Sequence, residues 1–220
     1  MEIRRILQAV AKAYRDFANA FSEGKNTDEL FAAFEASLRE SLGEYEIVYD
    51  YIWGKDTLGI DGVTKNYRPK KGDTLIMDVS IGVDGVFCDV CRTFFVGEPS
   101  KKQIEIYEMV LASLRAGQKA LRDGVRACDV YDAVNAVYLA KGKTLIHHAG
   151  HRIAEKPLLQ PQFLPENATS VKEGSIYTVE SGLYEDFGIR LENDFLITNT
   201  EAEDLFEDLS PLNIKEYILK

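Results

Sequence analysis

The fold of this chain is decided by residues 74–95, TLIMDVSIGVDGVFCDVCRTFF, and by a second stretch like it at residues 175–198, SIYTVESGLYEDFGIRLENDFLIT. Each consists of two apolar runs, rich in β-branched and aromatic residues, around a turn, which predicts an antiparallel hairpin. Each hairpin carries two carboxylates: Asp78 and Asp89 in the first, Glu180 and Glu192 in the second. We therefore expect an internal two-fold repeat that carries four acids.

Each hairpin is expected to hold its two acids close together. The midpoint between Asp78 and Asp89 falls on the first turn, so the two should lie opposite each other or nearly so, with Cβ atoms about 5 Å apart. The midpoint between Glu180 and Glu192 falls on the second turn, and the same argument applies. Two carboxylates that close repel each other unless they share a proton or a cation. The pattern therefore predicts a metal site.

The three histidines of the chain, His147, His148 and His151, lie between the hairpins. The segment around them is predicted to be a tight strand. In a strand His147 and His151 would face one way and His148 the other, so His148 is expected to take no part in the site. Oxygen ligands with one imidazole favour Mn²⁺, and they are also compatible with Co²⁺, Fe²⁺ or Zn²⁺.

Helix and strand patterns occur in the same order twice, which predicts a single α+β domain over residues 1–220, an antiparallel sheet flanked by helices. Asn26 with Glu29, and Ser100 with Gln103, form capping boxes that predict two helix starts. The predicted elements are helices over residues 2–23, from Asn26, from Ser100 and over about 127–141, a strand over residues 46–53, the two hairpins, and a loop containing Pro157, Pro161 and Pro165.

Composition excludes several partners and locations. The net charge of −10 makes a nucleic-acid backbone an unfavourable partner. No apolar run approaches the roughly 20 residues of a membrane span. The N-terminal sequence MEIRRILQAV lacks the layout of a signal peptide, so we expect a cytoplasmic protein. Cys88 and Cys91 would point to opposite faces of a strand, which favours reduced, buried thiols over a functional pair.

The segments IMDVS, CDVCRTF, IHHAGH, YTVESGLY and GIRLENDFLIT, in this order, resemble the pita-bread metallopeptidase family M24. This family includes methionine aminopeptidases, Xaa-Pro aminopeptidases and prolidases. The resemblance covers about residues 45–198 and implies the pita-bread fold with its pseudo-two-fold repeat. The forms TVE-x-G-x-Y and G-x-R-x-E-[ND] are more similar to the Xaa-Pro branch. From its length, we expect the chain to lack the additional N-terminal domain that Xaa-Pro enzymes usually carry.

The resemblance also implies a set of site residues. It places two divalent metal ions on five ligands, and it implies that Glu180 handles the proton of a metal-bound hydroxide. His147 corresponds to a histidine that contacts substrate. Thr93 and Arg190 correspond to residues that steady the ligands, as expected around a carboxylate site. The five ligands implied are Asp78, Asp89, His151, Glu180 and Glu192.

Two histidines of the family pattern are missing. One would lie seven residues after the metal-binding histidine, where this chain has Leu158. The other would lie upstream of the first hairpin, in the segment corresponding to residues 58–67, but the chain has no histidine before His147. Tyr67, Arg152 and Tyr184 are polar candidates to bind substrate in their place.

The predicted function is a metal-dependent exopeptidase that cleaves the N-terminal bond of short peptides, of the Xaa-Pro type. Two alternatives remain because of the missing histidines. The same metal site could hydrolyse another C–N bond in a small molecule, or the chain could be a non-catalytic member that binds a partner. The family also implies that a homodimer is plausible.

Overall fold

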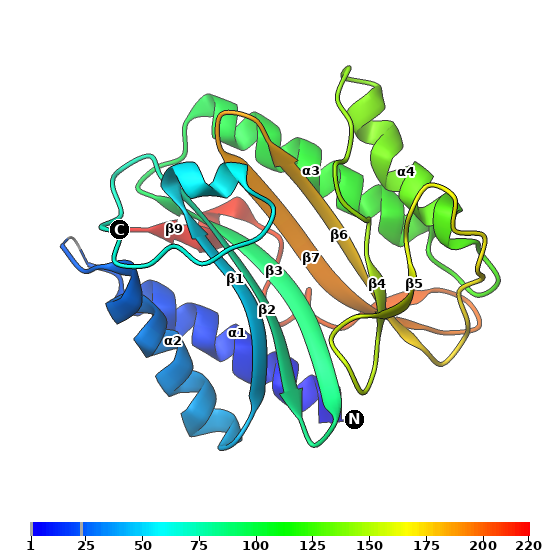
Figure 1. Cartoon of the computed structure of the whole chain (residues 1–220), viewed down its shortest axis with the longest axis horizontal. Helices are drawn as coiled ribbons and strands as arrows, with labels where there is room; N and C mark the ends of the chain where they lie inside the picture. The colour runs from blue at the N-terminus through cyan, green and yellow to red at the C-terminus, as the bar shows by residue number, and fades with distance from the viewer. Residues whose placement is uncertain (1, 23) are drawn as a thin grey trace.

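The predicted repeat is present as two units, each containing a pair of helices and a long hairpin (Figure 1). The computed structural model describes residues 2–22 and 24–220. The first unit contains α1 (Glu2–Ala20), α2 (Thr27–Leu42), β1 (Glu46–Trp53), the 3-10 helix η1 (Gly54–Leu58), β2 (Thr74–Val83) and β3 (Val86–Val96). The second contains α3 (Lys101–Ala120), α4 (Ala127–Leu139), β4 (His151–Ile153), β5 (Leu159–Gln162), β6 (Ile176–Tyr184) and β7 (Gly188–Ile197). The chain closes with β8 (Ala202–Asp204), η2 (Ile214–Tyr217) and β9 (Ile218–Leu219).

Capping residues start two helices as predicted. Asn26 begins α2 and Ser100 begins α3, each as half of a complete capping box. The first helix ends at Ala20, before the predicted limit at residue 23, which lies outside the described residues; the fourth ends at Leu139 rather than residue 141. In the described part of the chain, no helix combines the length and apolarity needed to cross a bilayer.

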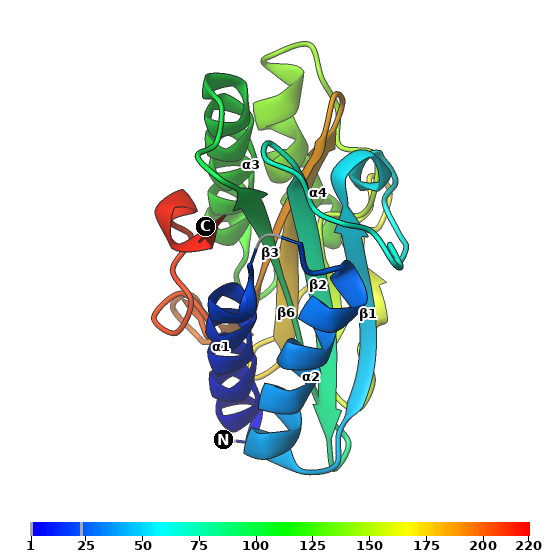
Figure 2. The ribbon, with the colours of Figure 1, turned by 90° about the vertical axis from the view of Figure 1, so that its left-hand side faces the viewer.

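The strands form one sheet in the order β1-β2-β3-β7-β6-β4-β5, with β8 beside β7 and β9 beside β3. All pairings are antiparallel except that of β3 with β9. Helices α1 and α2 cover the first hairpin, and α3 and α4 cover the second (Figures 1 and 2). The α+β class and the antiparallel sheet flanked by helices are therefore confirmed.

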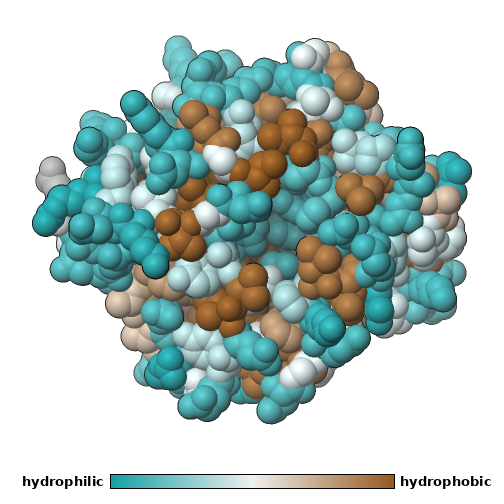
Figure 3. Space-filling model, in the orientation of Figure 1, coloured by the Kyte–Doolittle hydropathy of each residue, from teal (hydrophilic) through white to brown (hydrophobic). Residues whose placement is uncertain are grey.

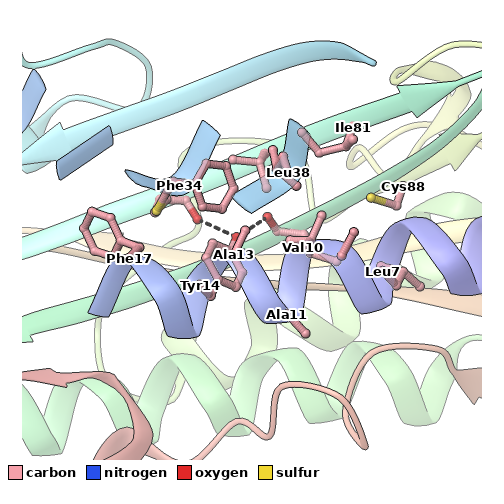
Figure 4. Close-up of a cluster of buried hydrophobic side chains, with 14 of the residues drawn as sticks. Leu7, Val10, Ala11, Ala13, Tyr14, Phe17, Phe34, Leu38, Ile81 and Cys88 are labelled. Carbon is pink, nitrogen blue, oxygen red and sulfur yellow. Dashed lines mark hydrogen bonds between the residues drawn. The ribbon is translucent and has the colours of Figure 1, made fainter. Parts of the chain in front are cut away.

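Helix α1 packs against one face of the first hairpin, so polar groups are left to the opposite face. Figure 4 shows Tyr14 of α1 with its hydroxyl between two carbonyls of the hairpin, 3.0 Å from that of Met77 and 3.1 Å from that of Val90. Cys88 packs in this same apolar cluster, whereas Cys91 lies on the opposite face, and both are buried free thiols. The predicted opposite orientation of the two cysteines is confirmed.

The pairing of the first hairpin differs from the prediction. Asp78 pairs with Cys91, and Asp89 pairs with Ser80, so the two acids are diagonal neighbours rather than opposite each other. The cause is the turn, which consists of Asp84 and Gly85, both at positive φ, and is centred one residue later than expected. Glu180 and Glu192 do pair directly, as predicted.

The prediction of a strand around the histidines is wrong. Strand β4 begins only at His151, and residues 144–150 form an irregular loop. Gly150 has φ 128°, and a Cβ there would lie 2.2 Å from the carbonyl oxygen of Thr178, so the loop presses its backbone against β6. The proline-containing segment, expected to be a loop throughout, instead contains the short strand β5.

Candidate metal centre

One line of paired residues crosses five strands and carries most of the acids. Asp50 of β1 pairs with Asp78 of β2, which pairs with Cys91 of β3; Cys91 pairs with Glu192 of β7, which pairs with Glu180 of β6. Paired residues on neighbouring strands project from the same face of a sheet. The two hairpins therefore present their acids to a common space.

The acids line a cavity of about 490 Å³. Its walls also include Val48 of β1, Ile60 and Asp61 after η1, and Leu158 before β5. On the face shown in Figure 3, the surface is hydrophilic and hollowed near its centre, with apolar patches around the hollow. Leu158 and residues 60–61 belong to the two positions where the resemblance leads us to expect histidines. Both positions border the cavity, and at Leu158 the wall is apolar.

Two groups of side chains in this cavity could each hold a metal ion. Asp89, His151 and Glu192 form one group; Asp78, Glu180 and Glu192 form the other. Within each group, one ligand atom from every residue lies within 4.8 Å of the others. Glu192 belongs to both groups, as a carboxylate that bridges two ions would. The structure thus brings together all five residues that the sequence analysis named as ligands.

The chemistry of these residues fits a bound cation. Oε1 of Glu192 is buried and has no hydrogen-bond partner among the described residues. Burial raises the pKa of Glu192 well above its usual range, and the charges of Asp89, Glu180 and Asp78 raise it further. Burial likewise raises the pKa of Asp78, together with Asp89 and Glu180 and against the opposing effect of Arg190. Divalent ions would remove this penalty by compensating the negative charge.

Glu180 differs from the other acids because cationic and imidazole groups surround it. Its carboxylate oxygens lie 3.3 Å from Nδ1 of His147, 3.2 Å from Nδ1 of His148 and 3.6 Å from a guanidinium nitrogen of Arg190. Burial raises the pKa of Glu180, but these neighbours outweigh the effect and lower the pKa below its usual value. Glu180 is therefore more readily ionised than Asp78 or Glu192.

Arg190 joins the acids of both hairpins. Its guanidinium nitrogens lie 3.2 Å from Oδ2 of Asp78 and 3.0 Å from Oδ2 of Asp50, in addition to the contact with Glu180. Thr93 holds the backbone of Arg190: its hydroxyl donates to the carbonyl at 2.8 Å and accepts from the amide at 2.9 Å.

The sequence analysis missed Asp50. Its second oxygen accepts from the amide of Gly62 at 2.8 Å, which ties the loop after η1 to this network. The signal that identified Asp78, a carboxylate inside an apolar strand, is also present in EIVYDYIW at residues 46–53.

Both His147 and His148 lie against Glu180, which contradicts the expectation that His148 would face away. The reason is the loop conformation before β4, because strand alternation does not apply there. The side chain of His147 is 6% exposed and that of His148 is 25% exposed. Burial lowers the pKa of His148.

The three polar candidates for substrate binding are placed differently. The hydroxyl of Tyr184 lies 3.2 Å from Nε2 of His147, beside the site. Tyr67 does not line the cavity, because its hydroxyl turns to Asp73 and donates to it at 2.8 Å. Arg152 is next to His151 in β4 and does not line the cavity either, as expected for neighbours with alternating side chains.

Comparisons with known proteins agree with this geometry. The Xaa-Pro dipeptidase of Pyrococcus furiosus is 28% identical in an alignment of 209 positions, which covers 92% of this chain and 60% of that protein. The solved structure of prolidase from Pyrococcus furiosus superposes with a TM-score of 0.87 at 26% identity, covering 93% of this chain and 62% of that one. The Xaa-Pro dipeptidase from Bacillus anthracis superposes with a TM-score of 0.89 at 24% identity, covering 98% and 61%, and so shows the shared fold alone.

The chain thus spans about 60% of the length of these relatives. Their fold confirms the pita-bread architecture predicted from the sequence. A model of metallopeptidase family M24 matches residues 1–199 of the 220. The chain belongs to metallopeptidase family M24.

Proposed function

We propose that residues 1–220 form the catalytic domain of a metal-dependent exopeptidase that cleaves the N-terminal peptide bond of short peptides, of the Xaa-Pro type. The observation that carries this proposal is the pair of ligand groups sharing Glu192, set in a cavity large enough for a peptide end. The relatives described above as an Xaa-Pro dipeptidase and a prolidase support the same reaction.

Five residues would hold two divalent ions: Asp78, Asp89, His151, Glu180 and Glu192. We favour Mn²⁺, because four of the five ligands are carboxylates, with Co²⁺, Fe²⁺ and Zn²⁺ as alternatives. When bound, such ions lower the pKa of a coordinated water and polarise a carbonyl oxygen.

The chain's own residues transfer the proton and hold the acids and the substrate in position. Glu180, which the surrounding histidines and Arg190 keep ionised, accepts a proton from the attacking water and passes it to the amine that leaves. Arg190 and Thr93 keep the acids in place through the contacts described above. His147 lies beside Glu180 and is oriented by Tyr184, at the wall where a substrate would lie.

The charge of the cavity favours a substrate with a free amino group. Asp61 is exposed at the rim, and the ligand acids lie below it. In the part of the chain that the structure describes, the cavity contains one permanent cation, Arg190, and its guanidinium already contacts Asp50, Asp78 and Glu180. A positively charged amino terminus would therefore be attracted to the acid side of the cavity.

A second candidate is the hydrolysis of another C–N bond in a small molecule. It is favoured by Leu158, which lines the cavity and is 48% exposed where family members carry an imidazole. An apolar wall at this point would select a different group of the substrate.

The test is release of amino acids from a panel of short peptides, including Xaa-Pro dipeptides and tripeptides, by protein loaded with Mn²⁺ or Co²⁺. Glu180→Gln serves as the blank, because it keeps the volume of the side chain and loses the proton acceptor. We expect release by the wild type and a loss of about 10²-fold or more in the variant. No release by metal-loaded wild type would reject the peptidase and favour the small-molecule hydrolase or a binding protein. Light scattering in the same preparation would test for a homodimer.

A further inference from the structure

The loop before β4 presents two imidazoles to Glu180, and their nitrogens are used differently. Nδ1 of His147 lies 2.7 Å from the carbonyl oxygen of His148, which can only accept, so Nδ1 of His147 carries the hydrogen. Nε2 of His147 is then an acceptor, and the hydroxyl of Tyr184 donates to it at 3.2 Å. Both nitrogens of His147 are therefore occupied within the protein.

The contacts of His148 favour the opposite tautomer. The amide of Gly150 donates to Nδ1 of His148 at 3.3 Å, whereas the 3.2 Å approach of Oε2 of Glu180 to the same nitrogen lacks the alignment of a hydrogen bond, so a lone pair on Nδ1 and the hydrogen on Nε2 fit these contacts best. None of the described residues accepts a hydrogen bond from this Nε2–H. The ring lines the cavity, and its side chain is four times as exposed as that of His147 (25% against 6%).

The Nε2–H of His148 is thus an oriented hydrogen-bond donor close to Glu180, the residue proposed to accept the proton of the attacking water. Its Nδ1 is 3.2 Å from Oε2 of Glu180, and its ring centre is 5.4 Å from that of His151. Leu158, in the same cavity, offers no hydrogen bond. A donor that is already oriented gains free energy when charge develops on a nearby oxygen, because no reorganisation is needed.

We propose that His148 is a catalytic residue of this chain, whose Nε2–H donates to the carbonyl oxygen of the peptide bond being cleaved. The inference rests on the proposed peptidase function. Water adds to the carbonyl carbon, the negative charge moves to that oxygen and is stabilised by His148, and Glu180 holds the proton removed from water. When the C–N bond breaks, the carbonyl re-forms and the amine leaves with the proton from Glu180.

The first test compares kinetics of His148→Ala, His148→Gln and the matched loop control Ile146→Ala, whose side chain is exposed and outside the cavity. We expect His148→Ala to lower kcat by about 10²- to 10³-fold with little change in KM and unchanged metal content. His148→Gln should recover part of the loss, because its amide N–H reaches close to the position of Nε2. Ile146→Ala should behave as wild type. A kcat of His148→Ala within twofold of wild type would overturn the proposal.

The second test needs no turnover. The chain has three histidines, so protein labelled with [¹⁵N]histidine gives a spectrum in which His148 is assigned by its absence from His148→Gln. Zn²⁺-loaded wild-type protein is titrated with a phosphinic dipeptide, in which a phosphinate that cannot be hydrolysed replaces the peptide bond. We expect the Nε2–H signal of His148 to shift on binding while the Nδ1–H signal of His147 stays in place.

The two proposals fail in different ways. If wild type cleaves no peptide, the peptidase function is rejected, and the phosphinate titration still decides whether His148 donates to a ligand. If wild type cleaves peptides while the signal of His148 does not move, the peptidase stands and the role of His148 is rejected.

Discussion

The two hairpins carry the same kinds of side chain but place their acids differently about the turn. In the β2–β3 hairpin, Asp78 lies five residues before the last pair, Val83 with Val86, whereas Asp89 lies three residues after it. In the β6–β7 hairpin, Glu180 and Glu192 each lie four residues from the last pair, Tyr184 with Gly188, and so face each other. The unequal spacing puts Asp89 off the line that joins Asp78 to Glu192, toward His151. The position of the turn thus divides one cluster of acids into two ligand groups.

The division into two ligand groups is tested most strongly by replacing Glu192, the residue that both groups share. Glu192→Gln should abolish binding of both ions and lower activity by about 10³-fold or more, because several kcal/mol of transition-state stabilisation would be lost. Asp89→Asn removes a ligand of one group only, and should leave about one bound ion. Calorimetric titration with Mn²⁺ measures both stoichiometries. Equal stoichiometry in the two variants would contradict the division into two groups.

The pKa shifts predict how the metal-free protein responds to pH. The pKa values of Asp78 and Glu192 are raised in the folded state from ordinary values of 3.8 and 4.5, mainly by burial, so the folded state binds more protons than the unfolded state above about pH 4. The free energy of unfolding therefore falls as pH rises from about 4 through the raised pKa values, by about 1.4 kcal/mol per pH unit for each group.

Thermal unfolding of metal-free protein between pH 4 and pH 8 checks this trend. Asp78→Asn should reduce the slope, and Mn²⁺ should restore stability most at the high end of the range. A melting temperature that rises steadily with pH in the metal-free protein would show that these two carboxylates are not the dominant groups.

The smallest expected effect concerns the turn itself. Gly85 has φ 76°, and a Cβ there meets no atom within 4 Å, so the cost of Gly85→Ala is conformational alone. We expect a loss of about 1–2 kcal/mol in urea unfolding. Asp84→Gly relieves the positive φ of 51° at the preceding position and should not destabilise the fold. A Gly85→Ala variant as stable as the wild type would contradict this prediction.

Most of the fold was predictable because its signals are local. Capping boxes, helical spacing and the alternation within the hairpins located four helices and the principal strands. The identity of the five residues that meet in the cavity was also predictable, since the family pattern places them in the hairpins and at His151. Their exact pairing was not, because it depends on which residues form the turn, and a shift of one residue changes every pair in the hairpin.

The orientation of His148 and the contribution of Asp50 could not be predicted from spacing. His148 turns toward Glu180 because Gly150 packs its backbone against Thr178, a contact between segments far apart in the sequence. Asp50 becomes part of the site because β1 pairs with β2 and because the guanidinium of Arg190, in β7, contacts its carboxylate. In both cases a tertiary contact decides what a residue does.

The boundary between β3 and β7 has a mechanical consequence. These strands share a single register pair, Cys91 with Glu192, and side chains complete the rest of the contact: Thr93 bonds to the backbone of Arg190, and Asp194 accepts from the amide of Asp89 at 3.1 Å. An ion held by Asp89 and Glu192 would bridge this boundary and act as a cross-link between the two halves of the molecule. Metal binding would then stabilise the pairing of the two halves as well as supply chemistry at the site.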